Sequence, residues 1–135
     1  MTITETMLAA HPTASTDPVD SALLIACIDA CAECAQACTS CADACLNEAD
    51  VADMAGCIST DIECADLCAV TARVLTRTSA DADVLTGLLI ACAAACAACA
   101  QQCESHAEMH RHCAACAEAC RRCEQACNDL RVTLR

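Results

Sequence analysis

The sequence predicts an all-α protein, an up-down-up-down antiparallel four-helix bundle with a cysteine-lined core. Three observations indicate this fold class. Cysteines recur at steps of three and four residues, the spacing of one helical face, in three long segments, and a fourth segment follows the same face with one step omitted. Short polar stretches separate these segments, as in up-down bundles. Phe, Tyr and Trp are absent, so Ala and 18 Cys supply much of the 57% of residues that are apolar.

The chain divides into a short arm and one domain. Residues 1–16 are polar, contain Pro12 and lack helical periodicity, so we expect a flexible or loosely docked arm. Residues 17–135 are expected to form the Cys-rich bundle, because 135 residues suffice for one compact domain and not for two.

The first two helices have recognisable ends. Asp17 and Pro18 suit an N-cap and a first helical position, and the helix that they open is expected to end near Leu46. A short turn follows. Asp50 is then expected to cap the second helix, which should end near Arg77.

The ends of the last two helices follow from the same kinds of residue. Ser79, with aspartates in the turn after it, is expected to start the third helix, which should end near Glu104. The sequence Ser-His-Ala-Glu at residues 105–108 has the pattern of a capping box, so we expect it to open the fourth helix. This helix should end near Val132, where Arg131 suits the negative end of the helix dipole.

The cysteines occupy positions at which a bundle core normally holds Leu or Ile. All 18 thiols are therefore expected to point inward. Asp61 stands where the second helix omits a cysteine, and burying its carboxylate would be costly without a metal, a thiol proton or a histidine partner. The stripe consists of Cys27, Cys31, Cys34, Cys38, Cys41, Cys45, Cys57, Cys64, Cys68, Cys92, Cys96, Cys99, Cys103, Cys113, Cys116, Cys120, Cys123 and Cys127.

A row of core cysteines can serve as apolar filling, as disulfides or as metal ligands. Ala, Val or Leu would fill the core without the hazard of oxidation. The N-terminus has no export signal, so we expect a cytoplasmic protein whose thiols stay reduced. Disulfides within one helix would also be strained, because helical neighbours have Cβ atoms roughly 5–6 Å apart and a disulfide needs about 3.8 Å. Metal binding is therefore favoured.

Softness and charge favour Cu(I) as the metal, with multiple ions per chain. Two thiolates on opposite sides of an ion stand roughly 4.6 Å apart when each bond is about 2.3 Å long, and neighbours on one helix can meet that span. Among the metals that thiolates select, Cu(I) commonly accepts two or three sulfurs. Tetrahedral Zn(II) sites would each bury two negative charges, at a cost. A Zn(II)-storing thiolate protein remains the main alternative.

Charge and composition exclude several partners. The net charge of −12 would repel nucleic acid and attract cations. Charged or amide side chains interrupt the apolar stretches, so we expect no membrane span. Nothing in the sequence indicates an exposed cysteine of low pKa beside a resolving cysteine, so we expect the protein not to be an enzyme. A copper transfer or sensing module of low stoichiometry is a further alternative, although it would leave most thiols without a role.

The two ends of the predicted tube differ. At one end leucines are expected to meet in a hydrophobic plug, and these are Leu24, Leu75, Leu85, Leu89, Leu130 and Leu134. The opposite end gathers soft and borderline groups that can bind Cu(I) and pass it inward. These are His110, His106, Met109 and Met54, with Asp61 one turn inside. His112 is expected to face solvent.

Dense Cys-x-x-x-Cys-x-x-Cys repeats over residues 18–133 resemble the bacterial copper storage proteins, specifically their cytosolic branch. The resemblance implies a four-helix bundle that assembles as a homotetramer and fills with many Cu(I) ions bound by Cys. It also implies that His, Met or Asp helps near the open end, and that the protein has no catalytic activity. A copper chaperone is a further expected partner, as the donor of the metal.

Overall fold

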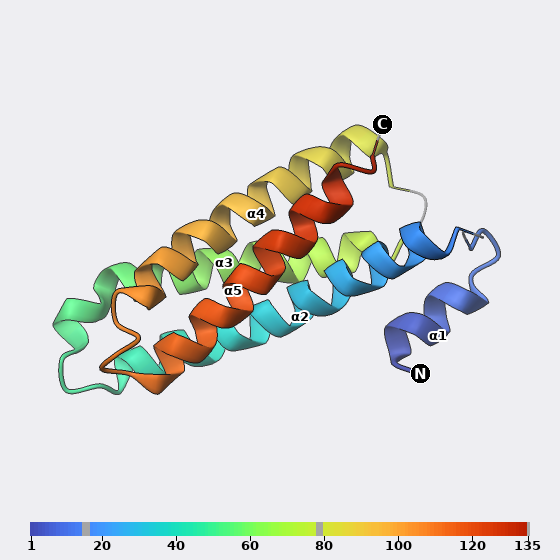
Figure 1. Cartoon of the computed structure of the whole chain (residues 1–135). Coiled ribbons are helices and arrows are strands. Elements are labelled where there is room, and N and C mark those ends of the chain that lie inside the picture. Colours follow the sequence, from blue (N-terminus) through green and yellow to red (C-terminus); the bar gives the residue numbers. More distant parts are fainter. Residues whose placement is uncertain (15–16, 78–79, 135) are drawn as a thin grey trace.

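A computed structural model describes the fold over residues 1–14, 17–77 and 80–134. Every regular element in these ranges is helical. The long helices are α2 (Pro18–Leu46), α3 (Ala55–Leu75), α4 (Ala82–Glu104) and α5 (Arg111–Arg131). They run alternately up and down, and the α2–α3 and α4–α5 turns lie together at one end of the molecule (Figure 1). The predicted antiparallel four-helix bundle is confirmed.

The core of the bundle is built from small side chains. α2 and α4 each pack against both α3 and α5. Buried alanines, such as Ala65, Ala93 and Ala117, belong to the same core cluster as the cysteines. Such side chains bury less apolar area than leucine does. Close approach of the helices, rather than large side chains, therefore gives this core its packing density.

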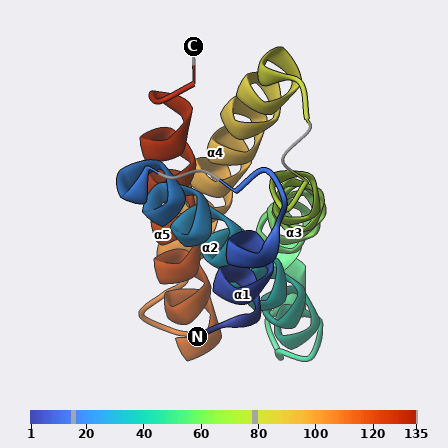
Figure 2. The same cartoon turned by 90° about the vertical axis from the view of Figure 1, so that its right-hand side faces the viewer.

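The N-terminal segment contains a helix that the sequence analysis did not predict. α1 (Ile3–Ala10) begins with a capping box, in which Thr2 and Glu5 each accept the other's backbone N–H. The Thr4 hydroxyl donates to Asp29 of α2 at 2.7 Å. α1 lies beside the start of α2, outside the four-helix arrangement (Figure 2). Two helical turns are too short to give a clear periodicity in the sequence.

The turn after α2 differs from the prediction. A 3-10 helix, η1 (Val51–Met54), precedes α3, and Asp50 makes no side-chain capping hydrogen bond. Its Oδ2 atom instead lies 3.1 Å from Nε2 of His110. The predicted capping role of Asp50 is therefore wrong, because the imidazole engages its carboxylate. α3 ends at Leu75, slightly before the predicted end.

The start of α2 agrees with the prediction, and α4 is capped by one of the aspartates that were expected in its first turn. α2 begins at Pro18 as predicted, and Asp17 Oδ1 accepts the backbone N–H of Asp20 at 3.4 Å. Ser79, the predicted start of the third helix, lies outside the described residues. Asp81 is the N-cap of α4, since its side chain accepts two N–H groups of the first turn at 2.8 and 3.3 Å.

Residues 105–108 do not open α5, so the predicted capping box is wrong. The Ser105 hydroxyl donates to the carbonyl of Gln102 at 2.6 Å and so satisfies the end of α4. The chain turns until His110, which is the N-cap residue of α5 and makes no side-chain cap. The other end agrees better, because α5 ends at Arg131, beside the predicted Val132.

Two helical stretches, Asp20–Leu46 and Ala82–Glu104, are long and apolar enough to cross a membrane by length and composition. Their apolar character comes largely from cysteine and alanine, and all of their cysteines are buried in the bundle. The outer face of the first stretch exposes Glu33 and Asp43. Helices that build the core of a soluble bundle meet the same length and composition criteria.

Candidate metal centre

The cysteines form one continuous column along the axis of the bundle. Each of the 18 is at most 1% exposed, and none forms a disulfide. Their Sγ atoms contact one another at 3.5 Å, as between Cys57 and Cys103, to 4.0 Å, as between Cys41 and Cys113. The expectation that every thiol points inward is confirmed.

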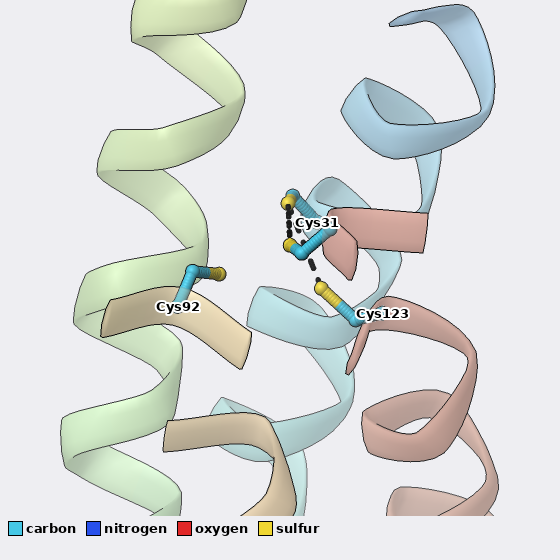
Figure 3. Close-up of side chains that lie close together, drawn as sticks. Cys31, Cys92 and Cys123 are labelled. Carbon is cyan, nitrogen blue, oxygen red and sulfur yellow. Dashed lines mark hydrogen bonds between the residues drawn. The ribbon is translucent and has the colours of Figure 1, made fainter. Parts of the chain in front are cut away.

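The column contains groups of four thiols, several of them overlapping, in which all four Sγ atoms lie within 4.8 Å of one another. Figure 3 shows Cys31, Cys92 and Cys123 pointing toward one another from α2, α4 and α5. Five of the groups are Cys31/Cys92/Cys123/Cys127, Cys34/Cys38/Cys64/Cys120, Cys34/Cys64/Cys68/Cys96, Cys38/Cys99/Cys116/Cys120 and Cys41/Cys45/Cys57/Cys113. Three of these groups share Cys34, Cys38, Cys64 or Cys120 with one another, so an ion in one of these sites has thiols of the next site beside it.

The arrangement of neighbouring thiols differs from the expected pairs along one helix. Contacts within a helix occur, as between Cys34 and Cys38 at 3.8 Å, but Cys38 also contacts Cys99 of α4 at 3.8 Å and Cys120 of α5 at 3.6 Å. Three thiolates around one ion with bonds of about 2.3 Å stand about 4.0 Å apart. The spacing of the column therefore suits three sulfurs from different helices at least as well as two from one helix.

Asp61 is the one carboxylate buried among the thiols of the described residues, with no exposed surface. Its Oδ1 atom accepts from the thiols of Cys99 at 3.0 Å, Cys116 at 3.4 Å and Cys103 at 3.6 Å. Burial raises the pKa of Asp61 to about 9, and the hydrogen bond and charge of Cys99 act in the same direction. The side chain is therefore a neutral acid at pH 7 in the metal-free column.

The acidity of the thiols varies along the column. Hydrogen bonding with Cys127 and Cys31 lowers the pKa of Cys27 to about 5, although burial opposes this effect. Burial and the charge of Cys41 raise the pKa of Cys45, at the other end, to about 11. A metal that binds thiolates must displace the remaining protons, so binding releases protons into solution.

The end of the bundle formed by residues 45–57 and 103–113 is here called the mouth. Met54 is fully buried there, whereas Met109 is 66% exposed. His106 is half-buried, and its Nδ1 atom is buried without a hydrogen-bond partner. An unpaired buried nitrogen is costly unless a ligand or water meets it.

His110 and His112 lie side by side in the mouth, with ring centroids 5.4 Å apart. His110 contacts Glu48 through Nδ1 and Asp50 through Nε2. His112 Nδ1 lies 3.4 Å from Cys41 Sγ, and its Nε2 lies 3.4 Å from Glu48.

The expectation that His112 faces solvent is therefore wrong. Burial lowers the pKa of His112, but the hydrogen bond to Cys41 and the charges of Cys41 and Glu48 together raise it above its usual value. The sequence does hold a signal for this placement, because His112 immediately precedes the inward-facing Cys113 at the start of α5. A side chain there lies beside the core stripe and reaches α2.

The opposite end of the bundle carries the leucine plug. Leu75, Leu89 and Leu130 are at most 5% exposed, and the other three predicted leucines are partly buried against the same core. Leu8 of α1 also packs there. A cavity of about 680 Å³ lies between α1 and the plug, and its lining combines leucines, such as Leu8 and Leu130, with polar residues, such as Glu5 and Arg77. The cysteines are therefore separated from solvent at this end by apolar side chains.

These features define a class of protein, a helical bundle whose interior is a multi-site thiolate ligand for soft metal ions. The copper storage protein family model matches residues 20–132. No curated protein sequence matches the chain.

Solved structures are similar to this protein over 78–97% of its chain. The copper storage protein Ccsp from Streptomyces lividans, loaded with 10 copper equivalents, is 52% identical, with a TM-score of 0.91, over 97% of this chain and 99% of that one. A Streptomyces lividans cytosolic copper storage protein with five coppers is 55% identical, with a TM-score of 0.85, over 88% and 100%. Cu(I)-bound BsCsp3 is 38% identical, with a TM-score of 0.71, over 78% and 94%. The chain belongs to the copper storage protein family.

Proposed function

We propose that this protein stores Cu(I), with its 18 cysteines as the principal ligands. The observation that carries this proposal is the continuity of the column, in which every thiol contacts another at 3.5–4.0 Å. A transfer or sensing protein needs a single small site, and such a site would leave most of these thiols without a role. Storage uses all of them.

Charge favours Cu(I) over other soft ions in this column. The interior described here holds Asp61 as its carboxylate and no cationic side chain. One Cu(I) for each thiolate leaves the column nearly neutral, whereas a Zn(II) ion with four thiolates leaves two buried negative charges. The four-thiol groups could nevertheless hold Zn(II) in a tetrahedral site. Zn(II) is therefore the competitor that a test must include.

The mouth is the proposed route for copper, because the other end is apolar. His110 and His106 offer imidazole nitrogens there, and Met54 offers a buried thioether beside the first thiols. Asp61, which accepts the hydrogen bond of Cys99 one turn further in, is a proposed oxygen ligand once a metal displaces its proton. Met109 remains a proposed ligand that would have to swing inward, since it is 66% exposed.

Selectivity tests the identity of the stored metal. The reduced protein is incubated without oxygen with Cu(I) and excess Zn(II), passed through a desalting column, and analysed for both metals. The proposal predicts retained copper in large excess over zinc. Retention of zinc in comparable amounts would support the Zn(II) alternative.

A homotetramer is the proposed assembly. The outer face of α4 carries no charge between Asp83 and Glu104, and it exposes Val84 at 59% and Ile90 at 50%. An uncharged apolar face of this kind suits contact with another copy of the chain. Ile90→Glu is expected to give a smaller species by light scattering. An unchanged mass would remove this face from the interface.

The remaining proposals concern the compartment, the domain bounds, the donor of copper and the absence of catalysis. A Streptomyces lividans relative is described as cytosolic, and we assign the same compartment here because reduced thiols are required for binding. The domain is proposed to span residues 17–135, with residues 1–16 as an arm. Copper arrives from a donor such as a chaperone, and the protein has no catalytic activity of its own.

A further inference from the structure

The mouth contains a cluster whose chemistry differs from that of the column. Glu48 lies in the turn after α2, and His110 and His112 lie at the start of α5. One carboxylate oxygen, Glu48 Oε2, contacts His110 Nδ1 and lies 3.4 Å from His112 Nε2. Two imidazoles from one helix start and one carboxylate from the facing turn therefore converge on one point.

The spacing of these atoms suits a metal ion. Nitrogen and oxygen ligands bind Zn(II) at about 2.0–2.2 Å, which places two of them about 3.3 Å apart at tetrahedral angles. The separation between Glu48 and His112 is 3.4 Å, and the contact between Glu48 and His110 would open slightly to admit an ion. The histidine side chains are only 13% and 26% exposed, and that of Glu48 is 31% exposed. A fourth position thus remains open to solvent.

A second carboxylate orients one of the ligands. Asp50 Oδ2 lies 3.1 Å from His110 Nε2, on the side of the ring away from Glu48. A carboxylate that accepts the second N–H of a metal-bound histidine fixes the ring and increases its basicity. Asp50 is therefore a positioning residue for this cluster, and its engagement explains why it does not cap the next helix.

The other ring nitrogen of His112 connects the cluster to the column. With Nε2 directed at the ion, Nδ1 carries the proton and donates toward Cys41 Sγ at 3.4 Å. Cys41 belongs to the four-thiol group nearest the mouth. An ion in the cluster would therefore hold His112 across the approach to the first thiols.

We propose that Glu48, His110 and His112 bind a divalent ion of borderline softness, with Zn(II) as its representative, at the mouth of the sulfur column. Imidazole and carboxylate ligands suit such an ion, whereas Cu(I) prefers the sulfurs beneath. Two carboxylates and two neutral imidazoles also carry two negative charges, which a divalent ion neutralises. The occupied site hinders passage of Cu(I), and this second part rests on the proposed copper storage.

The binding test uses protein already filled with Cu(I), so that the thiolates are occupied. Zn(II) is titrated against a chromophoric chelator, and the copper retained is measured in the same samples. One Zn(II) per chain is expected, with no loss of copper. Glu48→Gln should weaken Zn(II) binding by more than about tenfold, and Asp50→Asn by about 10–100-fold.

The matched control is Glu108→Gln, which removes the same charge from an exposed position in the neighbouring turn. It should leave Zn(II) binding unchanged. Absence of a Zn(II) site in the filled protein would overturn the proposal, as would equal weakening by Glu48→Gln and Glu108→Gln, which would indicate attraction by general charge only.

Failure of the copper-loading step would be a separate result, because it contradicts storage before any Zn(II) is added. In that case the metal-free, reduced protein is titrated with Co(II). Visible d–d bands that appear without a thiolate-to-metal charge-transfer band, and that weaken in Glu48→Gln, support the mouth site. A charge-transfer band with the first equivalent contradicts it.

Discussion

The two ends of the bundle are built from the same helices but have opposite chemistry. At the plug, Leu89 is fully buried, and Thr71, a buried polar residue one turn before Leu75 on α3, donates its hydroxyl to the Leu67 carbonyl at 2.7 Å. Toward the mouth, α3 buries Asp61 among thiols, and titratable side chains surround the opening. The comparison separates two kinds of chemistry, because apolar side chains close one end whereas groups that can bind metal ions and protons gather at the other.

The largest expected effect is at the plug. Leu89→Ala removes a fully buried side chain, so it should lower the free energy of unfolding of the metal-free protein by about 2–5 kcal/mol. Copper capacity should stay unchanged, because no thiol is altered. Chemical denaturation measures the first quantity. The matched control is Leu46→Ala near the mouth, which is 58% exposed and should cost less than about 0.5 kcal/mol.

Asp61→Asn tests the buried acid of the mouth half. Burial raises the pKa of Asp61 from its ordinary value of 3.8 to about 9 in the folded protein. The folded state therefore keeps a proton that the unfolded chain loses, and stability decreases as pH rises through this window. Asparagine does not ionise, so the variant does not lose stability for this reason as the pH rises.

Metal-free Asp61→Asn should accordingly exceed the parent protein in free energy of unfolding by about 1–3 kcal/mol at pH 8, and by much less near pH 4. Denaturation across this pH range measures the difference. A gap that does not grow with pH would show that Asp61 is ionised in the folded protein.

His110→Ala separates the route of copper from its storage. The variant removes an imidazole from the mouth but no thiol, so we expect copper uptake to slow by about tenfold, equivalent to about 1.4 kcal/mol in the barrier. Capacity should remain nearly unchanged. Stopped-flow absorbance at the thiolate-to-copper band measures the rate. Uptake at the parent rate would remove His110 from the route.

The smallest effect concerns α1 at the plug end. Thr4→Val removes the hydroxyl that donates to Asp29 at 2.7 Å, which should loosen α1 at a cost of about 0.5–1.5 kcal/mol. Faster hydrogen exchange confined to Ile3–Ala10 is the expected signature. Equal acceleration throughout α2 would instead show that α1 is part of the cooperative bundle.

The sequence is informative where one periodic signal dominates. Steps of three and four residues placed every cysteine on an inward face, and leucines at the ends of the stripes predicted the plug. These features depend on helix geometry alone. The same argument predicted Asp61 in the core, although it could not say which thiols its carboxylate would meet.

The errors arose where local groups have competing partners. Asp50 and Ser105 are residue types that commonly cap helices. The Asp50 carboxylate instead engages His110, and the Ser105 hydroxyl donates to a carbonyl at the end of α4. The prediction that His112 is exposed was wrong because its contact with Cys41 joins residues far apart in the chain, which a local sequence pattern does not reveal. The spacing of thiols between helices likewise depends on how closely the helices pack, which no single stripe determines.

The most direct test of the sulfur column is the number of Cu(I) ions that one chain holds. The reduced protein is titrated with Cu(I) without oxygen, in the presence of a competing chelator, and bound copper is measured per chain. Binding that continues toward one ion for each of the 18 cysteines before the chelator competes is the predicted result. Saturation after one or two ions would contradict storage and would indicate a transfer or sensing protein.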